Sequence, residues 1–426
     1  GSTEDIRSLI NETTHVYDLG DALIVPGFCD AHAHFMEGAV MSSDHFCKTL
    51  DKAGSEEECA IMMAEFAKKY PDLPRYFGYG WLPAYWGDNA DFPTKRSLDR
   101  YFPDKPVYLR AVDGHSEWMN SRALEESGYS EDWTPEYGYT EKFENGELTG
   151  LVREKGDTLA RKFDTELPDD EVESLQFRLM KKMNEKGLTS CTEMSAVLPE
   201  EIDDCYRYVK KFEDDGDLSI RLFLYPGTDI DPDPARIAQI RPYADKYNTD
   251  MLKIAGLKGF ADGVTSTYTA ALLKPYLDRP DTCGTLDHKE EQYFEWTKEA
   301  NRQGFGVRVH SIGDRAVKMM LKACEESNKV NDNKNIRNTI EHIEVIDPQD
   351  IPRFRKLNVV PSMQPLHLPL DRFDKLYRMG KERSRYEWAL KSIVRSGAVL
   401  AAGTDYPVAD FDPVPNIYMA VTRKGT

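Results

Sequence analysis

The chain has 426 residues, of which 40% are hydrophobic, and it carries a formal net charge of −19. This apolar share can fill a core and excludes extensive disorder, while the acidic balance argues against nucleic acid or an anionic membrane as a partner. Seven scattered cysteines without Cys-x-x-Cys spacing indicate reduced thiols, and no apolar run is long enough to span a bilayer. We therefore expect a cytoplasmic protein with a small-molecule substrate, and a homodimer is left open.

The first predicted strand leads into two histidines that are one residue apart. Residues 1–21 are polar and short of core material, and they look like the edge of a small domain. The apolar residues 22–25 predict a buried strand, which runs on to His32 and His34. Residues i and i+2 of a strand point to the same side, so the two imidazoles should project together. Because neutral imidazole is the commonest metal ligand among side chains, this pair predicts half of a metal site.

A helix and a long insertion come next. Ser55, followed by three glutamates, predicts the N-cap of a helix that ends near residue 70. Residues 71–165 are punctuated by prolines and carry tyrosines and tryptophans clustered at 76–86. We expect this segment to be an irregular, lid-like insertion with two short strands, one of them at 107–112.

From about residue 169, short apolar strands alternate with amphipathic helices. Strands are expected at 188–194, 220–225, 251–260, 306–310, 338–343, 359–363 and 398–404, and helices at 169–186, 200–214, 234–246, 289–303, 314–327, 348–357 and 382–396. Such alternation predicts parallel βα units. With the opening strand the count is eight, which is the number that closes a (β/α)8 TIM barrel.

Polar side chains stand at the ends of these predicted strands. In such barrels the catalytic groups gather at the carboxyl ends of the strands, so residues far apart in the chain should meet at one rim. The side chains in question are His32, His34, Lys258, His310, His342 and Asp405.

Eight stretches of the chain carry a resemblance to a known family. They are PGFCDAHAH (26–34), DGHSEWMNSRAL (113–124), KGFADG (258–263), VHSIGDRA (309–316), IEHIE (340–344), SMQP (362–365), GTDYP (403–407) and DPVP (412–415). On these motifs the chain resembles the metal-dependent amidohydrolase superfamily. More narrowly, it is similar to the amidohydrolase family 3 branch, which includes N-substituted formamide deformylases and an exoenzyme regulatory protein.

The resemblance implies a domain organisation. Residues 22–426 would form the metal-dependent hydrolase barrel, an α/β fold with the lid-like insertion at about 71–165. Members of the family usually add a small β-sandwich built from both termini, so residues 1–21 would be a remnant of that domain. The eighth barrel helix and the returning β-strands are expected to be missing from this sequence.

The resemblance also implies a binuclear metal centre, most simply with two Zn²⁺. A single metal ion in place of two, and iron or manganese in place of zinc, remain open. His32 and His34 would hold one ion, and His310 and His342 the second. Lys258 would bridge the two ions after carbamylation, since an ammonium cannot ligate a cation. Asp405 would ligate a metal and act as general base.

Two alternatives compete with a carbamylated Lys258. The lysine could instead form an ion pair with Asp262. Glu193, at the end of the second predicted strand, is a competing candidate for the bridging ligand.

The implied reaction is hydrolysis of a C–N bond other than a peptide bond, in an amide, N-formyl or cyclic amide substrate. A metal-activated hydroxide would attack the carbonyl carbon, and Asp405 would move the proton to the leaving nitrogen. A deaminase or mononuclear hydrolase of the same superfamily and a catalytically silent regulatory or binding protein are the alternatives. His115, Trp118 and Gln364 are candidates for substrate contacts, although Trp118 equally suits packing within the lid.

Overall fold

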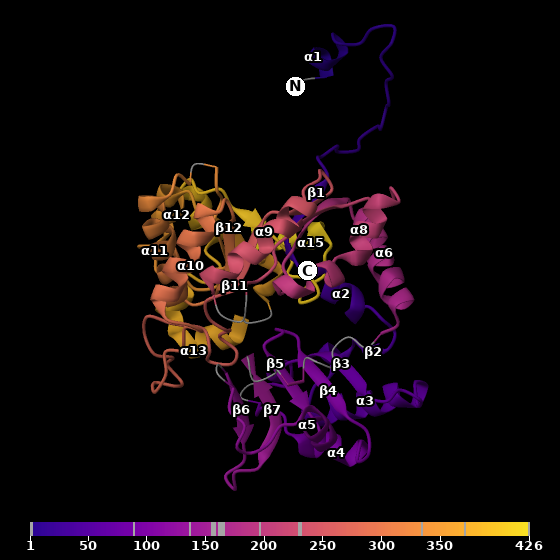
Figure 1. Ribbon diagram of the computed structural model, residues 1–426, viewed down its shortest axis with the longest axis vertical. Coiled ribbons are helices and arrows are strands. Elements are labelled where there is room, and N and C mark those ends of the chain that lie inside the picture. Colours follow the sequence, from indigo (N-terminus) through magenta and orange to yellow (C-terminus); the bar gives the residue numbers. More distant parts are fainter. Residues whose placement is uncertain are drawn as a thin grey trace.

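The computed structural model describes residues 3–87, 90–135, 138–154, 159–160, 167–195, 197–228, 232–333, 335–369 and 372–424. Figure 1 shows two packed parts: parallel strands surrounded by helices, and a second sheet at the lower end of the view. The first residues of the chain, with the short helix α1 (Thr3–Arg7), project away from both parts.

The strands predicted for the barrel form two sheets in which every pair is parallel. One sheet has the order β1 (Phe28–Ala33), β8 (Leu188–Glu193), β9 (Arg221–Leu224), β10 (Leu252–Ile254). The other has the order β11 (Gly256–Phe260), β12 (Gly306–Ser311), β13 (Thr339–His342), β14 (Val360–Met363), β15 (Ala401–Ala402). Parallel strands need crossover connections, and the helices supply them.

The two parallel sheets are linked at both of their edges. Only Ala255 separates β10 from β11, and an isolated parallel bridge pairs Gly227 with Lys258. At the opposite edges, a parallel bridge pairs Ala33, in β1, with Tyr406, which follows β15. The sheets therefore make up one barrel-like α/β domain.

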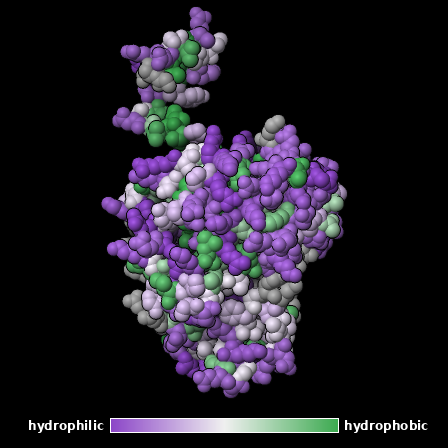
Figure 2. Space-filling view, turned by 90° about the vertical axis from the view of Figure 1, so that its left-hand side faces the viewer, coloured by the Kyte–Doolittle hydropathy of each residue, from purple (hydrophilic) through white to green (hydrophobic). Residues whose placement is uncertain are grey.

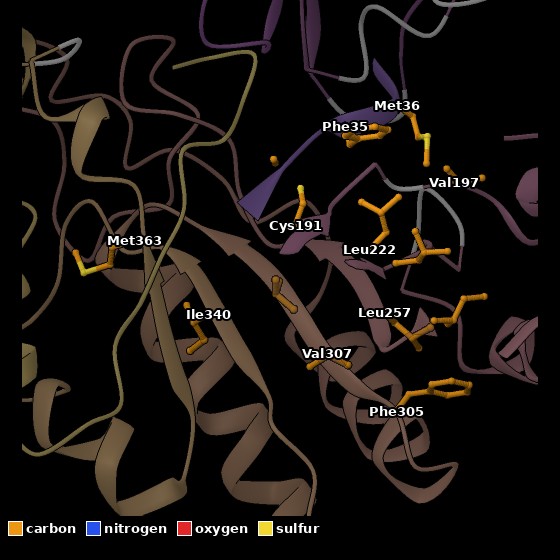
Figure 3. Packing of buried hydrophobic residues seen from close by; sticks show 14 of the residues in the cluster. Phe35, Met36, Cys191, Val197, Leu222, Leu257, Phe305, Val307, Ile340 and Met363 are labelled. Atoms are coloured by element: carbon orange, nitrogen blue, oxygen red, sulfur yellow. The ribbon is translucent and has the colours of Figure 1, made fainter. Parts of the chain in front are cut away.

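A large hydrophobic core fills most of this domain. Side chains from both sheets belong to it, and Figure 3 shows them packed together: Leu222, Leu257, Val307, Ile340 and Met363. Burial of such side chains contributes roughly 1.5–3 kcal/mol each, so the apolar strands stabilise the domain through this core.

Helices follow most of the strands as predicted, but the helix expected at 382–396 is replaced by the end of one helix, at 372–384, and a second one at 390–395. α6 (Asp169–Glu185) begins with three acidic residues, which suits the positive end of the helix dipole, and Gly187 follows it with a φ of 79°. The other helices of this part are α7 (Ile202–Cys205), α8 (Arg207–Asp214), α9 (Ile237–Lys246), α10 (Glu290–Arg302), α11 (Asp314–Val330), α12 (Ile351–Leu357), α13 (Arg372–Ser384), α14 (Leu390–Arg395) and α15 (Pro413–Thr422). Within the described residues, no helix has the length and apolar character needed to cross a bilayer.

The end of the chain differs from the prediction in one respect. The expected absence of a helix after the last strand is wrong, because α15 follows β15. Asp412 caps this helix by accepting a hydrogen bond from the backbone N–H of Val414 at 3.0 Å, and Pro413 occupies a first-turn position. Both are helix-start signals.

The inserted segment is more regular than predicted. It belongs to a mixed sheet with the order β2 (Phe46–Cys47), β3 (Tyr76–Trp81), β4 (Val107–Ala111), β5 (Ser116–Met119), β7 (Leu148–Arg153), β6 (Tyr139–Lys142). The prolines that suggested irregular structure lie outside these strands, as strand geometry requires. This second sheet has its own core, in which Trp81 and Trp118 are fully buried.

Three helices pack on the second sheet: α3 (Glu56–Lys69), α4 (Lys95–Tyr101) and α5 (Ser121–Ser127). The helix α2 (Phe35–Met41), which precedes this sheet in the chain, packs on α6 and β8 of the parallel part. The predicted N-cap of α3 is confirmed, since Ser55 Oγ accepts a hydrogen bond from the backbone N–H of Glu58 at 3.1 Å.

The opening strand starts later than predicted. Residues 22–25 are not a strand: Leu23 is 87% exposed and Ile24 is 75% exposed. Figure 2 shows apolar patches on this projecting end of the chain. The strand ladder begins only at Phe28, whose backbone N–H donates to the carbonyl of Gly187 at 2.9 Å, so the apolar run before it lacks a partner strand among the described residues. The interpretation of residues 1–21 as the remnant of a β-sandwich domain stays a prediction.

Candidate metal centre

The first strand of the parallel part, β1, and the segment that follows its last strand, β15, bring three predicted ligands together: His32, His34 and Asp405. The backbone N–H of Asp405 donates to the carbonyl of His32 at 2.7 Å, and the N–H of His34 donates to the carbonyl of Tyr406 at 2.7 Å. Gly403 permits this close approach, because a Cβ there would lie 2.5 Å from the backbone nitrogen of His32. The Asp405 side chain is thereby fixed beside the His-x-His pair.

A buried carboxylate ties the same two segments together. Asp30 accepts hydrogen bonds from the backbone N–H of His32 at 3.1 Å and of Thr404 at 3.0 Å, and from the Thr404 hydroxyl at 2.5 Å. Burial raises the pKa of Asp30 to about 6, against the effect of these donors. The residue therefore orients the chain on both sides of Asp405 and His32.

His32, His342 and Asp405 form a set of three donors. One ligand atom from each lies within 4.8 Å of the others. His32 Nε2 is 3.2 Å and His34 Nε2 is 3.1 Å from Asp405 Oδ1, and His342 Nδ1 is 3.9 Å from Asp405 Oδ2. The prediction that His32 and His34 project to the same side is thus confirmed.

The donor set fits a divalent cation. His32 Nε2, His342 Nδ1 and Asp405 Oδ1 are all buried, and among the described residues they have no hydrogen-bond partner. Buried polar atoms are rarely left in this way. Two imidazole nitrogens and a carboxylate oxygen are ligands that zinc and related ions accept, so the residues present match the group that the sequence implied.

Strained backbone accompanies these donors. His342 has a φ of 70°, Ile343 of 54° and Asp405 of 59°. Non-glycine residues seldom adopt the left-handed region, which costs of order 1–3 kcal/mol per residue and concentrates at functional sites. At His342 this conformation ends β13 and turns its imidazole towards Asp405.

Glu341 and Arg308 orient His32 from behind. The His32 Nδ1 lies 2.7 Å from Glu341 Oε2, and Arg308 Nε donates to Glu341 Oε1 at 2.6 Å. Although burial acts to raise it, Arg308 and His32 lower the pKa of Glu341 to about 2. A carboxylate on one ring nitrogen fixes the tautomer, which leaves the Nε2 lone pair for a metal.

The electrostatics of the site differ among the histidines. Burial lowers the pKa values of His310 and His342 well below their usual range, which favours their neutral, ligating form. Burial also acts to lower the pKa of His32, but Asp405 and Glu341 raise it above its usual value. Burial would raise the pKa of Asp405, but neighbouring His32 holds it well below its usual range. The carboxylate is therefore ionised.

Lys258 and its competitors are also buried at this rim. Burial lowers the pKa of Lys258 to about 8, while Glu341 and Asp405 act to raise it. The ion-pair alternative with Asp262 is not supported, because that carboxylate accepts three backbone hydrogen bonds, from Ala271, Ile312 and Gly313. The alternative bridging ligand Glu193 accepts from two backbone N–H groups.

A pocket opens beside the donor set, with His342 and Asp405 in its wall. Its wall combines residues of both parts of the molecule: Leu82, Val112, Asp113, His115, Val264, Ser266, His310, Ile312, His342, Glu344, His367, Asp405 and Val408. Residues that flank the strands of the second sheet therefore contribute directly to the pocket wall.

The structure places the three predicted substrate contacts differently. His115 lines the pocket. Trp118 lies in the core of the second sheet, beside Trp81 and Trp86, and is outside the pocket wall formed by the described residues. Gln364 is fully buried after β14, and its two amide atoms have no hydrogen-bond partner among the described residues.

Sequence reasoning missed His367. Its Nε2 lies 3.2 Å from the carbonyl of Thr404 and 4.0 Å from Asp405 Oδ2, and its ring is stacked 6.4 Å from that of His342. It follows β14 by four residues, in a short 3₁₀ turn, so strand-end position was the signal that could have found it.

Comparisons with known proteins agree with this geometry. The model of a family described as "Amidohydrolase family" matches residues 15–425. Protein LONG AFTER FAR-RED 3 of Arabidopsis thaliana is 28% identical over 99% of this chain and 72% of its own length. Putative amidohydrolase YtcJ of Bacillus subtilis is 28% identical over 97% of this chain and 76% of its own. An uncharacterized metal-dependent hydrolase from Pyrococcus horikoshii superposes with a TM-score of 0.69 at 26% identity, over 93% of this chain and 74% of that one.

Proposed function

The chain belongs to the amidohydrolase family, and from that membership we propose that it is a metal-dependent enzyme that hydrolyses the C–N bond of an amide, N-formyl or cyclic amide substrate. The observation that carries the proposal is a set of three buried ligand atoms beside a pocket, His32 Nε2, His342 Nδ1 and Asp405 Oδ1, which make no hydrogen bond within the described residues. The two parallel sheets would close into the (β/α)8 barrel, with the second sheet as its lid.

His32, His34, His342 and Asp405 would hold the metal in this proposal. A divalent ion there supplies polarisation of the substrate carbonyl and an activated water at neutral pH. Glu341 keeps His32 in the ligating tautomer.

Asp405 moves the proton. Its ionised, buried carboxylate accepts a proton from the attacking water and gives it to the leaving nitrogen as the C–N bond breaks. Acid–base catalysis by one positioned group contributes about 10²–10⁴-fold.

The second ion of the proposed pair of Zn²⁺ depends on His310 and Lys258. The His310 ring lies 4.4 Å from that of His342, and a carbamylated Lys258 would offer two oxygens. One observation favours a single ion instead: His310 Nε2 already faces the carbonyl of Gly263 at 3.2 Å. The mass of Lys258 in the intact protein and the metal stoichiometry separate the two forms.

The proposed setting is the cytoplasm, with a small-molecule substrate. All seven cysteines lie in the described part of the chain and are free thiols, which suits a reducing compartment. A homodimer is compatible with this proposal.

A substrate panel tests the proposed function. Protein stripped by a chelator and reloaded with Zn²⁺ should hydrolyse at least one member of a set of N-acyl, N-formyl and cyclic amides, and the stripped protein should not. Product amine is measured by chromatography, with an amino-substituted heterocycle included as a deaminase substrate. Ammonia release from that heterocycle alone would make the protein a deaminase, and inertness of the reloaded protein towards the whole panel would support the silent alternative.

A further inference from the structure

The second sheet sends one histidine into the pocket. His115 lies between β4 and β5 and lines the same wall as His310, with the two ring centroids 5.1 Å apart. The ring of His310 is followed by that of His342 at 4.4 Å and then by that of His32 at 4.9 Å. His115 therefore continues a row of imidazoles and stands at the end away from Asp405.

Glu154 fixes the orientation of this ring. The His115 Nδ1 lies 2.7 Å from Glu154 Oε2, and the Glu154 backbone N–H donates to the His115 carbonyl at 3.0 Å. The Thr269 hydroxyl donates to Glu154 Oε1 at 2.7 Å. With Nδ1 engaged, the polar ring atom that His115 can offer to a pocket ligand is Nε2.

The local backbone is adapted to this pair. Glu154 has a φ of 51°, in the left-handed region that non-glycine residues avoid. Gly263 leaves room for the carboxylate, since a Cβ there would lie 2.3 Å from Glu154 Oε1. The strained backbone of Glu154 and the space left by Gly263 both serve the contact between Glu154 and His115. They indicate that the fold specifically accommodates this pair.

Asp113 anchors the same turn to the parallel part. Its Oδ1 accepts from the His115 backbone N–H at 3.0 Å, and its Oδ2 accepts from the Ser266 hydroxyl at 2.7 Å. Burial acts to lower the pKa of His115, but Glu154 and Asp113 raise it to about 9. Glu154 thus holds the ring and Asp113 holds the backbone of His115, and the two carboxylates favour a ring that donates a hydrogen bond.

We propose that His115 is a further catalytic residue, which donates a hydrogen bond from Nε2 to the substrate carbonyl oxygen, and that Glu154 is its positioning residue. This rests on the proposed function. Since Asp405 delivers the proton to the leaving nitrogen, that nitrogen lies at the Asp405 end of the row of rings, and the carbonyl side faces His115. A donor aimed at oxygen that gains negative charge stabilises the transition state more than the ground state.

Variants at His115 test this role through kcat. His115→Phe removes the donor at similar size and should lower kcat by about 10²–10³-fold, with KM changed far less, as for loss of one oxyanion donor. His115→Gln keeps a hydrogen-bond donor and should recover part of kcat. The kcat of Glu154→Gln should lie between those of His115→Gln and His115→Phe. Metal content should equal that of the wild type in all three, and His45→Phe, at a histidine outside the pocket wall formed by the described residues, is the control.

A binding measurement keeps this test separate from turnover. A phosphonate analogue that carries an anionic tetrahedral oxygen should bind the metal-loaded His115→Phe variant at least tenfold more weakly than the wild type, by calorimetry. Kcat of His115→Phe within twofold of the wild type, or equal phosphonate affinity, would overturn the role of His115. If the wild type hydrolyses no amide but the phosphonate still discriminates, the proposed function fails and the donor role of His115 stands.

Discussion

Replacing Asp405 with asparagine should lower kcat by about 10²–10⁴-fold. The amide has nearly the same shape as the carboxylate but cannot accept the proton that has to reach the leaving nitrogen. Metal should still bind, because His32, His34 and His342 remain. Steady-state kinetics, elemental analysis and circular dichroism on the same preparation give the three readouts.

Asp410→Asn is the matched control for Asp405→Asn. It makes the same chemical change five residues away, at an exposed position, and should leave kcat unchanged. If Asp405→Asn hydrolysed the best amide at the wild-type rate, Asp405 would be removed from the role of general base.

Glu341→Gln should weaken metal binding by about 10–100-fold, as for loss of other groups that orient metal ligands. The amide no longer fixes the Nδ1–H tautomer of His32, since its N–H₂ competes for that ring nitrogen. The change also leaves Arg308 buried without its carboxylate, and breaking a buried pair costs about 3–5 kcal/mol of stability. Competition with a chromophoric chelator and denaturant unfolding measure the two effects.

A double variant separates these two effects of Glu341. Arg308→Met with Glu341→Gln removes both charges and should be more stable than Glu341→Gln alone, while its metal affinity stays low. Glu299→Gln is the control, because the Glu299–Arg302 pair lies at the surface, with Glu299 only partly buried, and surface pairs contribute about 0–1 kcal/mol. Wild-type metal affinity in Glu341→Gln would show that this carboxylate does not orient His32.

The positions of the candidate ligands at the carboxyl ends of the strands were predictable, because the local sequence shows where those strands end. The candidate ligands stand at or near the carboxyl ends of predicted strands, and the carboxyl ends of parallel strands share one rim. That rule alone placed His32, His34, His342 and Asp405 together. In the structure, a ring nitrogen of each histidine lies 3.1–3.9 Å from a carboxylate oxygen of Asp405.

The groups around the metal ligands could not be found in the same way. Glu341 precedes His342, and simple alternation along a strand would point the two side chains to opposite faces. The positive φ of His342 breaks that alternation, and nothing in a strand pattern signals it. The contact of Glu341 with His32 also joins residues 309 positions apart, which only the fold can reveal.

Two errors about secondary structure have physical causes. Residues 22–25 are apolar enough for a strand, but a strand also needs a neighbour, and none of the described residues pairs with them. The second sheet is more regular than its proline content suggests, because the prolines lie in the connections between strands and leave the strand pairing intact.

The central claim is that His32, His342 and Asp405 hold a metal ion, and equilibrium dialysis against Zn²⁺ tests it most directly. Chelator-stripped wild type should bind at least one equivalent, and His342→Ala should bind at least tenfold more weakly, while His45→Ala should match the wild type. Correctly folded wild type that binds no Zn²⁺, Mn²⁺ or Fe²⁺, or His342→Ala with undiminished affinity, would contradict the account.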